Sequence, residues 1–189
     1  MYRRRFRRGG YRYNKRGQRV YLYTRFTGVF ANIVCDGINP TLLAYNFSLN
    51  DLPNYTEFTT LYDNYKLNAV KISFRPKITQ SVSTGTINNP DATVPFYSCI
   101  DYNDSGALPT IDAIRDYKTC RVSTILRPKA RYIHKPKIVD SSSTVRSAWI
   151  STGSPDINWY GLKVSIPPTG TATQIGVEAK YYLSFKNVK

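Results

Sequence analysis

The chain has 189 residues, with 27 Lys and Arg against 12 Asp and Glu, which gives a formal net charge of +15 at pH 7. No stretch approaches the roughly 18 apolar residues of a membrane-spanning helix, so we expect no membrane insertion. Three cysteines, Cys35, Cys99 and Cys120, match no metal or redox spacing. We therefore expect buried, reduced thiols rather than a disulfide framework.

The positive charge is concentrated at the start of the chain. The first 25 residues hold ten of the basic residues and no carboxylate, and the first acid is Asp36. Such a block of like charge does not fold on itself, because no buried apolar surface offsets the repulsion. We expect residues 1–19 to form a basic arm that becomes ordered on a polyanion, followed by one domain over residues 20–189.

The residue types in the arm favour single-stranded nucleic acid. Its cations neutralise phosphates, and the aromatic rings between them stack on unpaired bases. The same run is compatible with a signal read by nuclear import receptors, and an inert tail is the plainer alternative. The predicted nucleic-acid-binding residues are Arg3, Arg4, Arg5, Phe6, Arg7, Arg8, Tyr11, Arg12, Tyr13, Lys15, Arg16 and Arg19.

Beyond the arm, alternation with a period of two predicts strands through most of the chain. The clearest case is Ile175–Phe185, where every odd position is apolar. Caps and helical spacing predict short helices over Tyr55–Tyr65, with Thr56 as N-cap, and over Leu108–Tyr117. Polar loops are expected at 77–93 and 101–109. In chain order, the eight predicted strands are 20–34, 70–75, 95–102, 120–126, 130–138, 145–151, 160–166 and 175–185.

Eight strands with unequal loops and two short helices predict an all-β fold. An up-and-down barrel has shorter and more even turns, so a double-sheet sandwich with Greek-key connections is favoured. The expected architecture is a single eight-stranded antiparallel jelly-roll sandwich with short inserted helices and a basic N-terminal arm.

A second basic cluster lies in the segment RPKARYIHKPK, at 127–137. Its cations all occupy odd positions, which places them on one face of an extended segment. Two interpretations stay open: a surface for a polyanion, either packaged nucleic acid or a host cell-surface glycan, or a solvated strand face that protects a sheet edge. With a similar Arg-Pro-Lys segment, the candidate patch comprises Arg75, Lys77, Arg127, Lys129, Arg131, Lys135 and Lys137.

No catalytic constellation is evident, and we expect neither enzyme activity nor a cofactor or metal. His134 is the single histidine, which excludes a two-histidine metal site, and no neighbouring acid is placed to orient it. No phosphate-binding P-loop sequence is present. Asp101 and Asp104 could hold Mg²⁺ in a nuclease, but aspartates at strand ends are ordinary turn residues.

With arm and sandwich together, the chain resembles the capsid proteins of small circular single-stranded DNA viruses of the circovirus and cyclovirus kind. FTTLYDNYKLNAVKISFRP (Phe58–Pro76) resembles the family's aromatic turn and basic strand. NWYGLKVSIPP (Asn158–Pro168) and AKYYLSFKNVK (Ala179–Lys189) resemble the strands that close the jelly roll. The resemblance implies a T=1 shell of sixty copies, with arms inward around a circular single-stranded DNA genome, in the virion and, during assembly, the host nucleus.

The alternative is a cellular RNA-binding protein with a basic N-terminal extension, similar to a ribosomal protein. Such proteins usually spread positive charge over the body as well. Here residues 26–189 carry 17 basic and 12 acidic residues, which favours the capsid interpretation.

Overall fold

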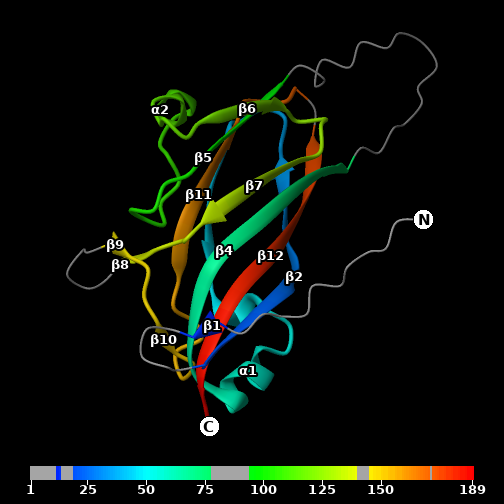
Figure 1. The fold of residues 1–189 in the computed structure, drawn as a ribbon. Helices are drawn as coiled ribbons and strands as arrows, with labels where there is room; N and C mark the ends of the chain where they lie inside the picture. Colours follow the sequence, from blue (N-terminus) through cyan, green and yellow to red (C-terminus); the bar gives the residue numbers. More distant parts are fainter. Residues whose placement is uncertain (1–11, 14–18, 78–93, 140–144, 171) are drawn as a thin grey trace, which may run out of the picture.

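The computed structural model describes residues 12–13, 19–77, 94–139, 145–170 and 172–189. Two antiparallel sheets pack face to face, and the view of Figure 1 looks onto the first of them, sheet A. In spatial order sheet A contains β1 (Arg12–Tyr13), β2 (Arg19–Cys35), β12 (Thr173–Val188), β4 (Tyr62–Lys77) and β10 (Ile150–Ser151), and β7 (Lys129–His134) also pairs with β4.

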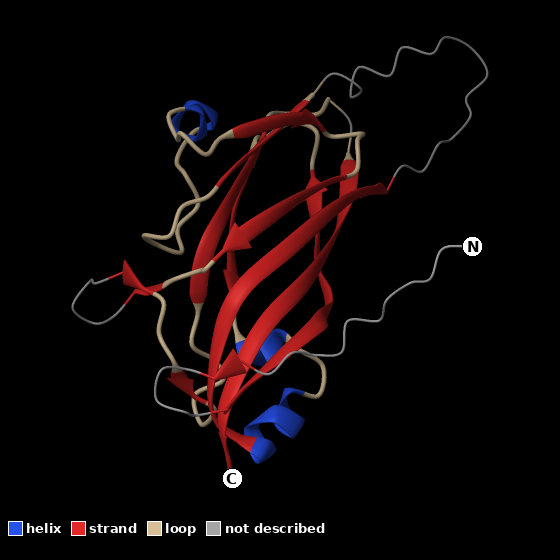
Figure 2. Cartoon of the chain, in the orientation of Figure 1, coloured by secondary structure: helices blue, strands red, loops and turns tan. Residues whose placement is uncertain are grey.

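Sheet B lies behind sheet A (Figure 2) and has four strands. In spatial order it contains β3 (Thr41–Phe47), β11 (Trp159–Ile166), β5 (Pro95–Cys99) and β6 (Arg121–Thr124). A separate short ladder joins β8 (Ile138–Val139) to β9 (Val145–Arg146). The chain crosses between the sheets repeatedly, and consecutive main strands in sheet A are not neighbours: β12 lies between β2 and β4. This is the predicted jelly roll, with four main strands in each sheet.

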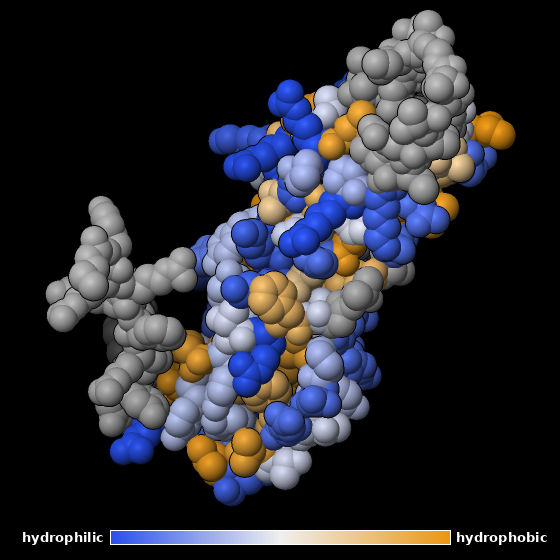
Figure 3. All heavy atoms as spheres, turned by 90° about the vertical axis from the view of Figure 1, so that its right-hand side faces the viewer, coloured by the Kyte–Doolittle hydropathy of each residue, from blue (hydrophilic) through white to orange (hydrophobic). Residues whose placement is uncertain are grey.

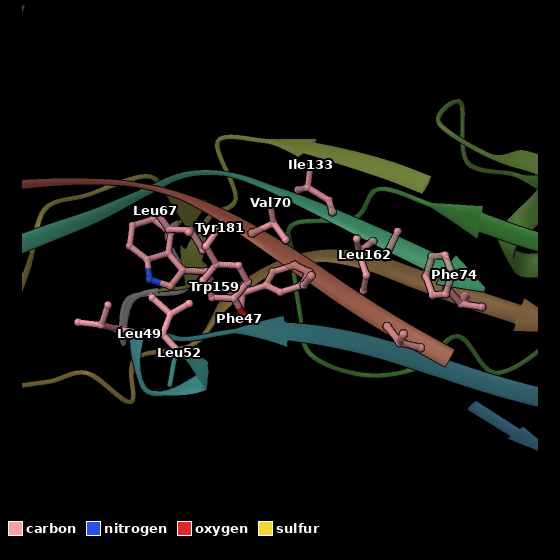
Figure 4. Packing of buried hydrophobic residues seen from close by; sticks show 14 of the residues in the cluster. Phe47, Leu49, Leu52, Leu67, Val70, Phe74, Ile133, Trp159, Leu162 and Tyr181 are labelled. Atoms are coloured by element: carbon pink, nitrogen blue, oxygen red, sulfur yellow. The ribbon is translucent and has the colours of Figure 1, made fainter. Parts of the chain in front are cut away.

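The core between the sheets follows from the period-two pattern. The odd residues of β12 from Ile175 to Phe185 are at most 1% exposed, as predicted. Figure 4 shows Val70, Phe74 and Tyr181 of sheet A facing residues of sheet B. The rings of Phe47 and Tyr181 meet edge to face at 6.0 Å. Burial of each such side chain contributes about 1.5–3 kcal/mol, and the many large residues in this layer account for the sandwich.

Short helices close one end and part of one face. The 3-10 helix η1 (Leu49–Asp51) and helix α1 (Tyr55–Leu61) lie at the end of the sandwich where the chain terminates (Figure 2). Phe58 of α1 stacks on Phe185 of β12 with ring centroids 4.7 Å apart. Helix α2 (Ile111–Arg115) is capped by Thr110, whose hydroxyl accepts the Ala113 N–H, and it packs on the outer face of sheet B.

Two predicted elements need correction. The helix predicted to reach Tyr65 ends at Leu61 and is preceded by Asn54, not Thr56, as its N-cap. Tyr62 and Tyr65 already belong to β4, because their rings pack on Phe185 there. The run 145–151 is divided between β9, which pairs with β8, and β10, which pairs with β4.

The sequence did not predict β3. Its sequence TLLAYNF has no alternation, and six of its seven residues are half-buried, so both faces are partly covered. β4 ends at Lys77, which is the first residue of the predicted loop 77–93. Residues 78–93 of that loop lie outside the described residues. In the described part of the chain, no helix is long and apolar enough to cross a membrane.

Candidate nucleic-acid interface

The basic arm joins the sandwich at the edge of sheet A. Arg12 and Tyr13 form β1, whose main chain pairs with Val20 and Arg19 at the start of β2. The predicted boundary between residues 19 and 20 therefore falls inside β2, and residues 12–13 of the predicted arm pair with that strand. The reason is that an edge strand such as β2 carries unpaired main-chain groups that a neighbouring segment can satisfy. The other predicted arm residues, 3–8, 11, 15 and 16, lie outside the described residues.

The pleat of β7 divides the second basic cluster. Ile133 is fully buried in the core, and Arg131 lies on the same face with 6% of its surface exposed. The guanidinium Nη2 of Arg131 donates to the Thr119 carbonyl at 2.9 Å. The prediction of one exposed basic face is thus wrong for Lys129 and Arg131, because the apolar residue between the cations sets the inward face of the strand.

Lys129 is half-buried, and its ammonium is engaged within the protein. Its ammonium donates to the Thr124 carbonyl at 2.6 Å and sits 3.8 Å from the ring centroid of Phe96. Burial lowers the pKa of Lys129 to about 8. The hydrogen bond ties Lys129 to the turn between β6 and β7, while its burial disfavours the charged form.

The pKa of Lys129 predicts a pH dependence of stability. In the unfolded chain this lysine keeps its proton up to its ordinary pKa of 10.5, whereas the folded protein releases it near 8. The unfolded state then binds more protons between these values, so the free energy of unfolding rises with pH across this window, by up to about 1.4 kcal/mol per pH unit.

Lys129→Met should remove this slope and leave the affinity for single-stranded DNA unchanged. Denaturant titrations between pH 7.5 and 10 measure the slope, and oligonucleotide binding measures the affinity. An unchanged slope, or weaker DNA binding, would show that the lysine is charged and accessible.

The remaining cations of the predicted patch are dispersed. Arg75, Lys77, Arg127 and Lys135 are exposed, whereas Lys137 is half-buried with its ammonium 5.3 Å from the ring centroid of Tyr102. Lys135 follows β7 with a φ of 50°, and its N–H donates to the Asn68 carbonyl of β4. The structure therefore brings Lys135 next to sheet A and leaves Arg127 in the turn after β6.

Asp101 and Asp104 are turn residues that also bind a buried lysine. The Asn103 N–H donates to Asp101 and the Gly106 N–H to Asp104, which confirms the turn interpretation. Between the two carboxylates lies the ammonium of Lys163, 2.8 Å from each. The described residues contain no group of three or more side chains placed to hold a metal ion.

Burial opposes ionisation of Asp101, but hydrogen bonds from Lys163, the Asn103 N–H and Tyr117 outweigh it and hold its pKa below the ordinary value. The bond to Asp101 in turn raises the pKa of Tyr117 to about 12. This network fastens the segment before α2 to β11 and is structural.

The thiols and the histidine sit as ordinary side chains. All three cysteines carry thiols rather than disulfides, with Cys35 and Cys99 buried and Cys120 half-buried. Burial raises the pKa of Cys99 to about 12, which makes it a poor nucleophile. His134 is exposed, and its ring stacks on Tyr132 at 6.5 Å.

Sequence reasoning did not single out the lysines on the outer face of sheet A. They are Lys66 and Lys71 on β4 and Lys180 and Lys186 on β12. The alternation of both strands could have identified these lysines, because they occupy the polar positions of the pattern. Only the pairing of β4 with β12 places them side by side.

Viral capsid proteins are among the proteins built as jelly rolls, and here a densely cationic segment precedes the sandwich. The circovirus capsid protein family matches residues 1–189, and the chain belongs to this family. No curated protein sequence matches the chain.

Solved structures agree on the fold. The BFDV capsid protein in its 60-mer form superposes with a TM-score of 0.62 at 14% identity, over 90% of this chain and 95% of that one. The decameric form of the same protein gives 0.59 at 15% identity, over 89% and 100%. The Cucumber Necrosis Virus structure gives 0.55 at 14% identity, over 90% of this chain and 57% of that one.

Proposed function

We propose that this capsid protein assembles into a closed T=1 shell of sixty copies and packages circular single-stranded DNA through its basic arm. The observation that carries the proposal is the position of the arm: ten cations without a carboxylate precede Asp36, and the segment enters the sandwich at the edge of sheet A. The similar BFDV capsid protein forms a 60-mer, which supports the copy number. The role is structural rather than enzymatic.

The packaging step is electrostatic. Cations of the arm replace the counterions condensed on the DNA backbone, and the release of these ions drives binding without sequence preference. The rings among the arginines add stacking on unpaired bases. Before assembly, the same basic run serves as a signal for nuclear import receptors, which places assembly in the host nucleus.

The shell itself requires apolar contacts between copies. Several large apolar residues are exposed in the subunit, and Ile38, at 81%, is the most exposed among those described. Asp36 accepts the N–H groups of Ile38 and Asn39, so the turn presenting Ile38 is held rigidly. In the shell we propose, this rigid apolar tip is buried against a neighbouring copy.

Ile38→Asp should prevent shell formation while the subunit stays folded, because the exposed side chain supports no core contact and a carboxylate is costly to bury between copies. Ile38→Val keeps an apolar tip and should assemble like the parent. Sedimentation measures particle yield, and the thermal unfolding midpoint of the subunit checks the fold. Normal particle yield from Ile38→Asp would exclude this turn from the interface.

Electron microscopy of the purified full chain tests the proposal as a whole. Uniform small particles that contain DNA are expected. Monomers or ribonucleoprotein would contradict it, and the latter would favour the RNA-binding alternative.

A further inference from the structure

We propose that the outer face of sheet A is a second surface for single-stranded nucleic acid, distinct from the arm. On this face, cations of β4 and β12 hold phosphates, and exposed rings of β2 and β7 stack on bases. The inference rests on the proposed function only in that the strand bound here is the packaged one.

The charge on this face is unbalanced. The described strands of sheet A contain two carboxylates, Glu178 and, at the start of β4, Asp63. Glu178 is engaged by Arg75 at 3.1 Å. The cations of β4 and β12 on the outer face are Lys66, Lys71, Arg75, Lys77, Lys180 and Lys186.

Two of the cations crowd each other. The pKa of Lys66 is lowered, first by burial and then by repulsion from Lys135, which follows β7. Lys135 is held near β4 by its hydrogen bond to the Asn68 carbonyl. A bound phosphate would relieve the repulsion between these two lysines. This part of the face therefore favours binding of an anion.

Aromatic rings lie in the same rows as the cations. Across the sheet, Lys180 pairs with Phe26 on one side and with Lys71 on the other. Lys71 in turn pairs with Tyr132 of β7. Phe26 is 63% exposed and Tyr132 53% exposed, so the row begins and ends with open rings.

The rings also contact one another and the cations. Tyr132 meets Tyr182 of β12 edge to face at 5.8 Å, and the ammonium of Lys180 lies 4.9 Å from the Phe26 ring centroid. Lys186 lies 4.8 Å from the ring centroid of Trp149. Figure 3 shows the side toward β2, where apolar side chains are exposed between hydrophilic ones.

This mixture favours nucleic acid over a sulfated polysaccharide. Cations alone suffice to bind sulfates, whereas exposed rings next to cations match bases next to phosphates. Duplex DNA hides its base faces, so the rings gain contacts only from an unpaired strand. The favoured ligand is therefore single-stranded DNA bound without sequence preference.

The charge test uses the full chain. Lys71→Gln/Lys180→Gln should lower the affinity for a thymidine homopolymer and reduce the magnitude of the log–log salt slope by about 1.4, at about 0.7 for each lost phosphate contact. The matched control, Lys118→Gln/Arg121→Gln, removes two exposed cations near α2 and β6 and should leave the slope unchanged. Equal effects of the two variants would overturn the proposal.

The ring test separates the possible ligands. Tyr132→Leu should weaken homopolymer binding roughly 5- to 100-fold, the loss of about one stacked base, and leave heparin binding unchanged. Tyr160→Leu, on sheet B, is the control. No loss of homopolymer affinity, or an equal loss for heparin or duplex DNA, would overturn the single-strand assignment. DNA content of shells lacking residues 1–11 tests the arm independently, so either role can fail alone.

Discussion

Removal of residues 1–11 should give shells that assemble but contain little DNA. This deletion takes away Arg3, Arg4, Arg5, Arg7 and Arg8, five of the nine cations up to Arg19, and it leaves β1 paired with β2. Deletion of residues 1–19 would also remove β1 and the first residue of β2, and would mix a packaging effect with a structural one. The ratio of absorbance at 260 and 280 nm, with electron microscopy of the same particles, measures the DNA content.

The salt dependence of DNA binding measures how many phosphate contacts the arm makes. If each of the nine cations neutralises one phosphate, the arm contributes about −6 to the log–log slope, and the deletion should remove about 3.5 of it. A variant with the five arginines replaced by lysine keeps the charge and should package normally.

Truncated shells filled with DNA would contradict the packaging role of the arm, as would a slope near −1 for the full chain. Absence of shells would show that residues 1–11 are needed for assembly itself.

Lys163→Met should cause the largest loss of stability among single substitutions in the described chain outside the apolar core, about 3–5 kcal/mol. Lys163 and Asp101 are 3% and 5% exposed, so removal of the ammonium leaves a buried carboxylate without its counterion. Replacing one partner of such a pair costs far more than the pair itself contributes, because the remaining charge is neither solvated nor paired.

Two controls make this prediction specific. Lys118→Met removes an exposed lysine and should change the free energy of unfolding by less than about 0.5 kcal/mol. Lys163→Met/Asp101→Asn removes both charges and should recover part of the loss. Denaturant unfolding of the subunit measures all three, and a loss below about 1 kcal/mol for Lys163→Met would show that the carboxylate is solvated.

The same network sets the response to acid. Because the pKa of Asp101 is lowered in the folded protein, its contribution to stability is complete above the ordinary pKa of 3.8 and is lost as the pH falls through the lowered value. This anchor therefore persists in mildly acidic surroundings and does not act as an acid trigger.

Most strands could be predicted because each buries one face. In β12 and β4 the apolar residues recur at every second position, and the structure buries those positions. In β3 the sequence lacks this signal, because the strand lies at the edge of sheet B and is partly covered on both faces. The helix predicted to extend to Tyr65 failed for the opposite reason: a helical spacing of aromatic residues arose by chance where a strand packs on Phe185.

The candidate site was harder to predict than the fold. Alternation in 127–137 was real, but it cannot say which face points inward when the cations and Ile133 share odd positions. The structure buries that face of β7, because burying the isoleucine in the core stabilises the fold more than exposing the cations to water would.

The sequence alone determined the arm, the all-β sandwich and which residues of each strand share a face. These depend on local charge density and on a period of two, both of which are readable over short distances. Only the tertiary structure decided which cations meet. Lys71 and Lys180 are more than a hundred residues apart in the chain, and they become neighbours because β12 inserts between β2 and β4. Strand order arises from long-range pairing, for which one sequence carries no local signal.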